Sequence, residues 1–525
     1  MAERIEAATL WELVERRAAA TPDAVMLKDD QGRQLTFGQY RDEAERVAAG
    51  FAGLGLGEGD SVSWQLPTWN ETLVLAVALS RLGVVQNPIL PIYREREVGF
   101  CVRQTRAKAL IVPSDSTNAD LASIAKGIAA QQDGLQILHV DRGSIATGDP
   151  ASLPPATAVP SADRPPVRWR FYTSGTTADP KGAQHTDATV AASAVGMCEA
   201  YELGPDDVHA LLFPFTHIGG LGLLMAQLMS GMRQIVIESF ADPNTIPMMS
   251  AEGVSLLGAG TFFHQQYLTA QRRQLDTPLF PKARAFIGGA APKPPQLHQD
   301  IVNEMPGDGN VGICSGYGLT EAPIIFCASV RSPSEKLANT EGQATPGVDC
   351  RVVTLDGTMA GPNEEGEIRV KGPMVMAGYV DASLDAAAFD EDGYFRTGDL
   401  GYLDEDGFVV ICGRLKDVII RKGENISAKA VEDVLHTSPK VAEAAVIGLA
   451  DDDTGERACA VVVTAPDAEP LSFDEMIELC SNAGLMKQMY PEQLELADSL
   501  PRNPTGKVLK HKMREIYGER PFSRD

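Results

Sequence analysis

Residues 172–182 read YTSGTTADPKG and are the most informative stretch of the chain. Small residues and hydroxyls surround two glycines, and a single lysine, Lys181, follows closely. Glycine permits close backbone approach, and N–H groups and hydroxyls can donate to phosphate oxygens. Lysine adds a compact positive charge. The stretch therefore predicts a phosphate-binding loop, against the alternative of a Ser/Thr/Gly-rich surface loop.

The order of residues differs from that of a Walker A loop, which needs Gly directly before Lys and Ser or Thr directly after it. Pro180 and Gly182 stand at those two positions. An ordinary P-loop NTPase is therefore disfavoured.

Three further motifs carry groups that suit a nucleotide. Residues 288–292 read GGAAP after the apolar residues 285–287, as expected where backbone passes close to a flat ligand at a strand end. Residues 316–321 read GYGLTE and offer an aromatic face, a hydroxyl and a carboxylate, which can stack a base, hold a phosphate and bind Mg²⁺. In YFRTGD, Asp399 either accepts hydrogen bonds from ribose hydroxyls or simply forms a turn.

Charge excludes several classes of partner. The 525 residues include 71 acidic and 46 basic ones, a formal net charge of −25. Such a chain does not coat nucleic acid or an anionic membrane through its overall field, so an anionic substrate must meet a local basic patch. Residues 413–425 and 502–514 contain two basic clusters that either suit this purpose or form a solvated basic face, the latter above all for Lys510, Lys512 and Arg514.

The location expected from the sequence is the cytoplasm. No run approaches the ~18–20 apolar residues of a membrane helix, and the N-terminus lacks the apolar segment of a signal peptide. The eight cysteines are scattered without a CxxC pair, which indicates buried thiols in a reducing compartment. The oligomeric state stays open, with a homodimer as one option.

The pattern of elements predicts an α/β fold. Strands alternate with helices through the first hundred residues, where Thr36 opens a helix with a capping box, and this argues for layered α/β subdomains. From about residue 342 short strands and Asp-Gly turns predict a small barrel-like β part. Beyond a boundary at 413–417, a helix capped by Ser427 and two apolar stretches, 444–447 and 458–463, predict a small α+β domain.

Five motifs in order are similar to those of a known family: YTSGTTADPKG, GYGLTE, YFRTGDLGYLDEDGF, GRLKDVIIRKGENI and NPTGK. They resemble the adenylate-forming (AMP-binding) superfamily of acyl-CoA synthetases, luciferases and peptide-synthetase adenylation domains, over essentially the whole chain. Residues 87–97 and Ala178-Asp179 resemble the cyclohexanecarboxylate-CoA ligase branch. The resemblance implies an N-terminal domain, 1–415, that binds acid and ATP, and a mobile C-terminal domain, 416–525, with its hinge at Lys416.

The activity that this resemblance implies is that of an acid–thiol ligase. ATP, with Mg²⁺, would activate an apolar monocarboxylic acid as an acyl-AMP, and coenzyme A would then form the thioester. Alicyclic, aromatic, medium-chain fatty and steroid side-chain acids are all compatible, because three windows expected to line the acid pocket, 215–224, 259–263 and 312–318, lack Lys and Arg. The alternatives are a luciferase-like oxygenase, a stand-alone adenylation enzyme and a non-catalytic nucleotide-binding protein.

The resemblance also assigns individual residues. The phosphate loop would use Thr173, Ser174, Gly175, Thr176, Thr177 and Lys181, with Thr176 counted among the catalytic residues. Adenine would meet Gly288, Gly289, Ala290, Tyr317 and Gly318, while Thr320 reaches the α-phosphate, Glu321 holds Mg²⁺, and Asp399 and Arg414 hold the ribose. Lys507 would bridge the two reacting anions, Gly423 would narrow the pantetheine tunnel, and His217 would lie near the acyl site, where gating or orienting is favoured over general base catalysis.

Two positions depart from the family pattern. Ala178 replaces the last free glycine of the usual loop, which removes some backbone freedom. Asp187 replaces the histidine that is common a few residues after PKG. Neither position carries a group assigned to the chemistry, so an active enzyme is still expected.

Overall fold

The computed structural model describes residues 4–114, 121–157, 165–173, 179–274, 277–289, 293–422, 424–451, 453–502, 508–518 and 520. The chain divides into two compact units. Unit 1 comprises residues 1–290, 297–349 and 371–395, and unit 2 comprises residues 291–296, 350–370 and 396–525. The expected mixed α/β architecture, with layered sheets in a large N-terminal part and a small α+β part at the C-terminal end, is confirmed. The boundary at 415/416 stays a prediction.

The first sheet of unit 1 has the strand order β15-β14-β13-β12-β11-β9-β10-β1-β2. Its central strands pair in parallel, and antiparallel pairs close both ends of the sheet. The strands are β1 (Val25–Asp29), β2 (Gln34–Thr36), β9 (Val208–Leu211), β10 (Arg233–Val236), β11 (Leu256–Leu257), β12 (Ala285–Gly289), β13 (Ile313–Tyr317), β14 (Phe326–Cys327) and β15 (Gln343–Ala344).

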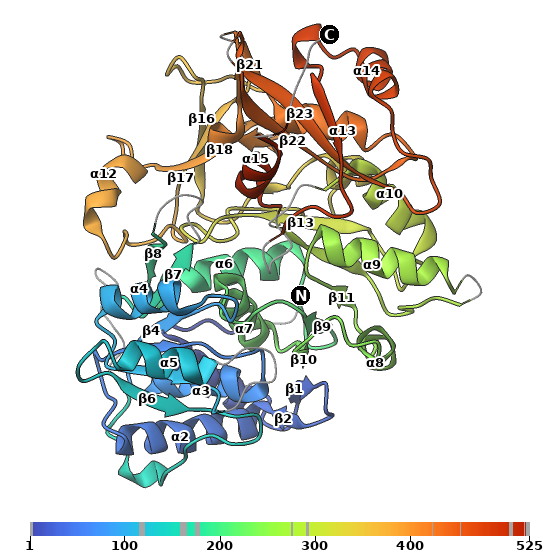
Figure 1. Ribbon diagram of the computed structural model, residues 1–525. Coiled ribbons are helices and arrows are strands. Elements are labelled where there is room, and N and C mark those ends of the chain that lie inside the picture. The colour runs from blue at the N-terminus through green and yellow to red at the C-terminus, as the bar shows by residue number, and fades with distance from the viewer. Residues whose placement is uncertain are drawn as a thin grey trace. The chain divides into compact units, whose positions relative to one another are not determined.

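The second sheet of unit 1 has the order β6-β5-β3-β4-β7-β8. Only its edge pair β7–β8 is antiparallel among the pairs that the described residues form. The strands are β3 (Ser61–Trp64), β4 (Val85–Pro88), β5 (Ala109–Val112), β6 (Gln136–His139), β7 (Trp169–Thr173) and β8 (Lys181–His185). Helices α4 and α5 pack beside β3, β5 and β6 (Figure 1).

The helices of unit 1 connect these strands and cover the sheets. They are α1 (Leu10–Ala20), α2 (Phe37–Gly53), α3 (Asn70–Arg81), α4 (Glu95–Thr105), α5 (Leu121–Ala129), α6 (Asp187–Ala200), α7 (Ile218–Ser230), α8 (Thr245–Ala251), α9 (Thr261–Arg272), most of α10 (Pro295–Glu304), α11 (Ser334–Asn339) and α12 (Asp385–Ala388). Helix α6 contacts both β8 and β14, and α3 contacts both β4 and β1. A shared helical layer therefore lies between the two sheets.

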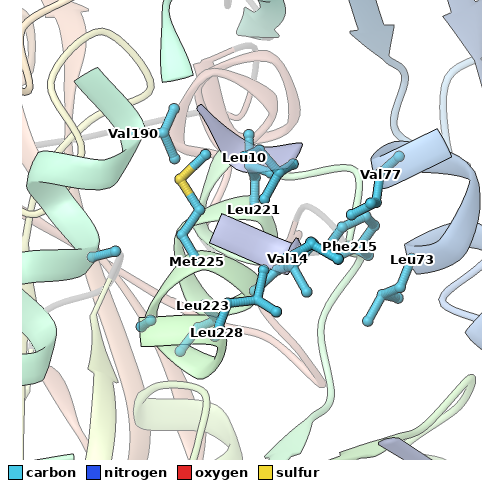
Figure 2. Close-up of a cluster of buried hydrophobic side chains, with 14 of the residues drawn as sticks. Leu10, Val14, Leu73, Val77, Val190, Phe215, Leu221, Leu223, Met225 and Leu228 are labelled. Carbon is cyan, nitrogen blue, oxygen red and sulfur yellow. The ribbon is translucent and has the colours of Figure 1, made fainter. Parts of the chain in front are cut away.

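The main core of unit 1 fills this shared layer. Figure 2 shows apolar side chains of α1, α3, α6 and α7 pointing toward one another. Helix α7 is apolar on every side, which is the pattern of a helix buried all round. The Arg17 guanidinium of α1 donates to the Leu228 and Met229 carbonyls at 2.7 and 2.6 Å, which satisfies the end of α7.

Local sequence signals account for several element ends. The predicted capping box of Thr36 is confirmed, because its hydroxyl accepts from Gln39 N while the Gln39 side chain accepts from Thr36 N. In unit 2, Ser427 caps α13 (Ala428–Leu435) by accepting from Ala430 N. These caps satisfy backbone N–H groups that the first helical turn leaves without partners.

Unit 2 contains two small sheets and, as complete elements within its described residues, three α-helices. One sheet has the order β16-β17-β18-β19, and the other has the order β21-β20-β23-β22 with β24 on β23. The remaining elements are β16 (Asp349–Val353), β17 (Gly366–Lys371), β18 (Phe395–Leu403), β19 (Val409–Arg414), β20 (Ile419–Arg421), β21 (Glu424–Ile426), β22 (Val441–Asp451), β23 (Gly455–Thr464), β24 (Gln493–Leu496), α14 (Phe473–Asn482) and α15 (Lys510–Gly518). The predicted pairing of 444–447 with 458–463 is confirmed in the hairpin β22–β23.

All eight cysteines are free, as expected from their spacing. No helix within the described ranges has both the length and the apolar character to cross a membrane.

Candidate active site

The predicted phosphate loop connects two paired strands. Thr173 ends β7, Lys181 begins β8, and the two residues lie opposite each other in the antiparallel register. The two strands lie side by side in Figure 1. Both ends of the loop are therefore fixed by the edge of the second sheet. Ser174, Gly175, Thr176, Thr177 and Ala178 lie outside the described residues.

The other edge of β8 pairs with residues 377–380. Gln184 N donates to the Gly378 carbonyl at 3.0 Å, and Ala377 N donates to the Gln184 carbonyl at 2.8 Å. Val380 N donates to the Gly182 carbonyl at 2.8 Å, and Ala183 lies opposite Tyr379. Nothing in the sequence motifs pointed to this segment, although it lies directly beside the base of the loop.

Glu321 lies within reach of this segment. The Tyr379 hydroxyl donates to Glu321 Oε1 at 2.9 Å, and Met376 N donates to the Glu321 carbonyl at 2.8 Å. The Glu321 side chain is buried, and the Lys181 ammonium lies 5.7 Å from the centre of the Tyr379 ring. Burial and the Glu321 charge raise the pKa of Tyr379 well above its usual value, so its hydroxyl stays protonated and donates.

Thr320 is held by His185, a histidine that belongs to none of the sequence motifs. His185, fully buried at the end of β8, places Nε2 at 2.8 Å from the Thr320 carbonyl and Nδ1 at 3.0 Å from Thr189 Oγ1. Because the carbonyl can only accept, Nε2 carries a proton. Burial lowers the pKa of His185 to about 4, so the ring is neutral near pH 7.

The predicted adenine contacts lie at the carboxyl ends of β12 and β13. These strands pair in parallel, with Gly288 opposite Ser315 and Gly289 opposite Gly316. A Cβ on Gly289 would lie 2.0 Å from the Gly316 carbonyl oxygen, so close strand packing is one physical reason for a glycine there. Tyr317, half-buried at the end of β13, packs against Phe326 with the ring centres 6.2 Å apart. Ala290 lies outside the described residues.

His217 caps the first turn of α7. Its Nδ1 accepts from Gly219 N at 3.1 Å, and its ring meets that of Phe213 edge-on at 6.2 Å. Desolvation lowers the pKa of His217 to about 4. A neutral ring whose Nδ1 accepts a hydrogen bond carries its proton on Nε2, so His217 presents a donor at that atom.

A small pocket joins His217 to Thr320. Its walls are mostly apolar and come from Pro88, Ile89, Leu90, Tyr93, Cys101, Phe171, Tyr172, Thr216, His217, Ile218 and Thr320. The buried Thr216 hydroxyl has no hydrogen-bond partner among the described residues. The structure thus brings together His217 and Thr320, which the sequence placed in separate motifs.

Unit 2 carries the predicted ribose pair. Asp399 on β18 and Arg414 on β19 face each other in the antiparallel register, and Arg414 Nε donates to Asp399 Oδ1 at 2.8 Å. Lys416 follows in the short helix 415–417, where burial and the neighbouring Arg414 lower its pKa. Gly423 and Lys507 lie outside the described residues.

Asp187 has a structural role at the start of α6. Its buried carboxylate accepts from Trp169 Nε1 at 2.7 Å and from Leu10 N at 3.0 Å. These bonds tie β7 and the first turn of α1 to the helix that follows β8. The departure from the family pattern is therefore accounted for by packing.

Comparisons with known proteins agree with this geometry. The family model described as AMP-binding enzyme matches residues 14–380, and that of the AMP-binding enzyme C-terminal domain matches residues 430–507. The chain belongs to the AMP-binding enzyme family. The resemblance stated from the motifs is thereby confirmed, whereas the finer likeness to cyclohexanecarboxylate-CoA ligases stays a prediction.

Named relatives of the chain are CoA ligases. The medium-chain fatty-acid–CoA ligase of Escherichia coli (strain K12) is 30% identical over 521 residues, which cover 97% of this chain and 90% of that protein. The long-chain-fatty-acid–CoA ligase FadD13 of Mycobacterium tuberculosis is 30% identical over 519 residues, which cover 97% of this chain and 98% of that protein. These relatives confirm, at the level of the family, the prediction of an AMP-forming acid–thiol ligase.

A solved relative extends the comparison to three dimensions. The structure of o-succinylbenzoate CoA synthetase (MenE) from Bacillus subtilis in complex with its acyl-adenylate intermediate has a TM-score of 0.80 and 27% identity, and the match covers 96% of this chain and 98% of that one. The layered fold read from the sequence is thus that of a CoA synthetase.

The residues around Glu321 fit the expected Mg²⁺. Magnesium usually binds through one or two carboxylates together with substrate phosphates, and keeps several waters. Glu321 offers a single buried carboxylate here. The donor set therefore suits an ion that arrives with a nucleotide.

Proposed function

We propose that the protein joins an apolar monocarboxylic acid to coenzyme A in two steps, with ATP consumed in the first. The carboxylate attacks the α-phosphorus of ATP, pyrophosphate leaves, and an acyl-adenylate forms. The thiol of coenzyme A then attacks the acyl carbonyl, and AMP leaves. One observation carries this proposal: beside the base of the predicted phosphate loop, the Tyr379 hydroxyl donates to Glu321 and the Lys181 ammonium lies over the Tyr379 ring.

The first step needs charge cancellation more than proton transfer. A carboxylic acid with a pKa near ~4 is already ionised at neutral pH, so no general base has to prepare it. The barrier arises because one anion approaches another, and fixed cations and donors lower it. Lys181 and the loop from Thr173 would surround the β- and γ-phosphates, and Mg²⁺ on Glu321 would neutralise phosphate charge.

Other residues would hold the nucleotide in place for this attack. Tyr317 and Gly318, with residues 288–290, would bind the adenine, and Thr320 would reach the α-phosphate. Asp399 and Arg414 would bind the ribose, for which a carboxylate that accepts from hydroxyls is suited.

The second step requires the Lys507 ammonium to leave the junction of the two anions. We propose that Lys507 moves away with the C-terminal domain, by rotation at Lys416, and that Gly423 then borders the path of the pantetheine arm. A thiol with a pKa of roughly 8–9 supplies some thiolate without a strong base. His217, with its donor at Nε2, would orient the acyl group.

The acid is proposed to have an apolar body and no second charge. The pocket between His217 and Thr320 has mostly apolar walls. Phe262, within the window 259–263, is exposed and packs edge-on against Phe240 and Phe263. A second carboxylate or an ammonium would need an opposite charge on such walls. Medium-chain fatty acids are the first class to test, since the Escherichia coli relative is named for them.

The test is pyrophosphate release across a panel of alicyclic, aromatic, fatty and dicarboxylic acids, with and without coenzyme A. We expect release that depends on an apolar monocarboxylic acid, and a thioester detected by mass spectrometry when coenzyme A is present. Acid-dependent release without any thioester would refute the ligase assignment. Under that outcome, oxygen uptake or light emission separates a luciferase-like oxygenase from a stand-alone adenylation enzyme.

The two steps can be separated by a variant of Lys507. Lys507→Ala is expected to abolish pyrophosphate release but to spare thioester formation from supplied acyl-adenylate, because its charge serves only the first step. Equal loss of both half-reactions would contradict the proposed role of Lys507.

A further inference from the structure

One face of β8 contacts two consecutive residues of the GYGLTE motif. Side chains of a strand alternate between its faces, so Lys181 and His185 lie on the same face. His185 donates directly to the Thr320 carbonyl. The link from Lys181 to Glu321 is indirect, because the Lys181 ammonium lies over the Tyr379 ring and the Tyr379 hydroxyl donates to Glu321. The position of this motif relative to the phosphate loop is therefore set by β8 and by the segment paired with it.

Tyr379 contacts two opposite charges with two different parts of its side chain. Its hydroxyl donates to the Glu321 carboxylate, and its ring lies under the Lys181 ammonium. An ammonium within about 6 Å of a ring centre is attracted by the negative face of the ring. A hydrogen bond from a hydroxyl fixes the orientation of a carboxylate. The Asp385 carboxylate also acts on the phenol through its charge.

The backbone holds Tyr379 firmly in this place. Tyr379 N donates to Asp385 Oδ1 at 2.8 Å, and its carbonyl accepts from Gln184 Nε2 at 3.0 Å. Gly378 has a φ of 119° and lies so close to Asp385 that a Cβ there would be 2.8 Å from Oδ2. Only glycine adopts this backbone without strain, so the turn before Tyr379 is fixed as well. The Tyr379 side chain is buried.

We propose that Tyr379 is a positioning residue for the adenylation step, which orients Glu321 for Mg²⁺ and steadies the Lys181 ammonium beside it. This inference rests on the proposed function, because that function is what assigns Glu321 and Lys181 to the nucleotide. In the proposed role, Tyr379 itself touches neither the substrate nor the metal. Its hydroxyl leaves Glu321 Oε2 available, because among the described residues Glu321 accepts only at Oε1.

The two contacts predict two separable effects. Partners that hydrogen-bond to a metal-binding carboxylate typically change metal affinity by 10–100-fold when removed. Tyr379→Phe removes the hydroxyl but keeps the ring under Lys181, so it should raise the Mg²⁺ concentration for half-maximal pyrophosphate release at least tenfold. Tyr379→Leu removes the ring as well, and should also weaken ATP binding in the absence of Mg²⁺ by about two- to fivefold.

The experiment measures binding as well as activity. Calorimetric titration of ATP, once with excess Mg²⁺ and once with EDTA, is carried out on the full-length wild type and on both variants. Tyr394→Phe is the matched control, since the Tyr394 hydroxyl also donates to a carboxylate, Asp349 Oδ2 at 2.6 Å, on an exposed surface. We expect Tyr379→Phe to bind Mg²⁺·ATP at least tenfold more weakly while its affinity for ATP in EDTA is unchanged.

A double-mutant cycle with Glu321→Gln separates positioning from general loss of structure. If Tyr379 acts through Glu321, Tyr379→Phe should have no further effect on Mg²⁺ dependence once Glu321 is Gln. An undiminished effect in that background, or a Tyr379→Phe titration that matches Tyr394→Phe, would overturn the inference. If the wild type binds Mg²⁺·ATP but releases no pyrophosphate with any acid, the proposed function is refuted. The calorimetric affinities of the Tyr379 variants then still decide whether Tyr379 positions Glu321.

Discussion

Replacement of His217 should slow the enzyme only modestly, because the hydrogen bonding of its ring suits a donor rather than a general base. Nδ1 already accepts from Gly219 N at 3.1 Å, so a neutral ring keeps its proton on Nε2. Desolvation lowers the pKa of His217 to about 4, which keeps the imidazole neutral throughout the pH range of an ordinary assay. Neither nitrogen then has a lone pair ready for the thiol proton.

The decisive perturbation is His217→Asn. Asparagine is among the preferred N-cap residues, so its side-chain oxygen can replace Nδ1 as the acceptor for Gly219 N. The stability of α7 should therefore change by only a few tenths of a kcal/mol. His217→Ala, which loses the cap, should cost about 1 kcal/mol in the free energy of unfolding. Urea denaturation of both variants checks that the catalytic comparison starts from an intact fold.

The assay is thioester formation from supplied acyl-adenylate and coenzyme A between pH 6 and pH 9. Loss of a general base typically costs 10²–10⁴-fold in rate, and the loss depends on pH. Loss of one orienting donor should cost less than about tenfold, roughly 1.4 kcal/mol, at every pH. A hundredfold loss in His217→Asn, or a wild-type inflection near pH 6–7 that this variant abolishes, would show instead that His217 acts as a general base.

Three further changes test other parts of the account. Asp399→Asn weakens the carboxylate that accepts from Arg414, and should raise the KM for ATP by about tenfold or more in the pyrophosphate assay. An unchanged KM would count against ribose binding. His185 has a folded pKa of about 4, below the unfolded value of about 6.5, so its neutral form stabilises the fold above pH 6.5 and this stability is lost as the pH falls toward 4. Wild-type stability should drop by about 1.4 kcal/mol from this group between pH 7.5 and 5.5, and urea denaturation of His185→Gln should lack that component. Asp187→Ala leaves Trp169 Nε1 and a backbone N–H without an acceptor, and should lower the free energy of unfolding by about 3 kcal/mol, whereas Asp187→Asn should lose less.

Local signals in the sequence were sufficient for the element ends and for one hairpin. The capping box of Thr36 and the cap of Ser427 depend only on residues three positions apart, and the structure has both. The hairpin of residues 444–447 with 458–463 joins two apolar stretches across a short turn. Each of these features is decided by neighbours in the chain, which is why the residue types alone revealed them.

The contacts that fix the candidate site join distant parts of the chain. The bond between His185 and Thr320 spans 135 residues, and that between Tyr379 and Glu321 spans 58. His185 occupies a position where burial alone would explain a histidine, and Tyr379 follows a glycine in a stretch without a motif. Such pairings depend on which strand edges meet, and hydrophobic periodicity carries no information about that.

The residues of unit 1 assigned to the phosphates and to Mg²⁺ are held by strands or by the segment paired with β8. Thr173 and Lys181 lie at strand ends, and Thr320 is bonded to His185 at the end of β8. Glu321 is bonded to Tyr379, which pairs with β8. Adenylation needs its anions held within a fraction of an ångström, and strands provide that rigidity. The role proposed for Lys507 needs the opposite property, since a charge that helps the first step would retain AMP in the second. In the sequence Lys507 stands more than 90 residues beyond Arg414, the last residue of β19, so the proposal assigns it to a part of the chain outside unit 1.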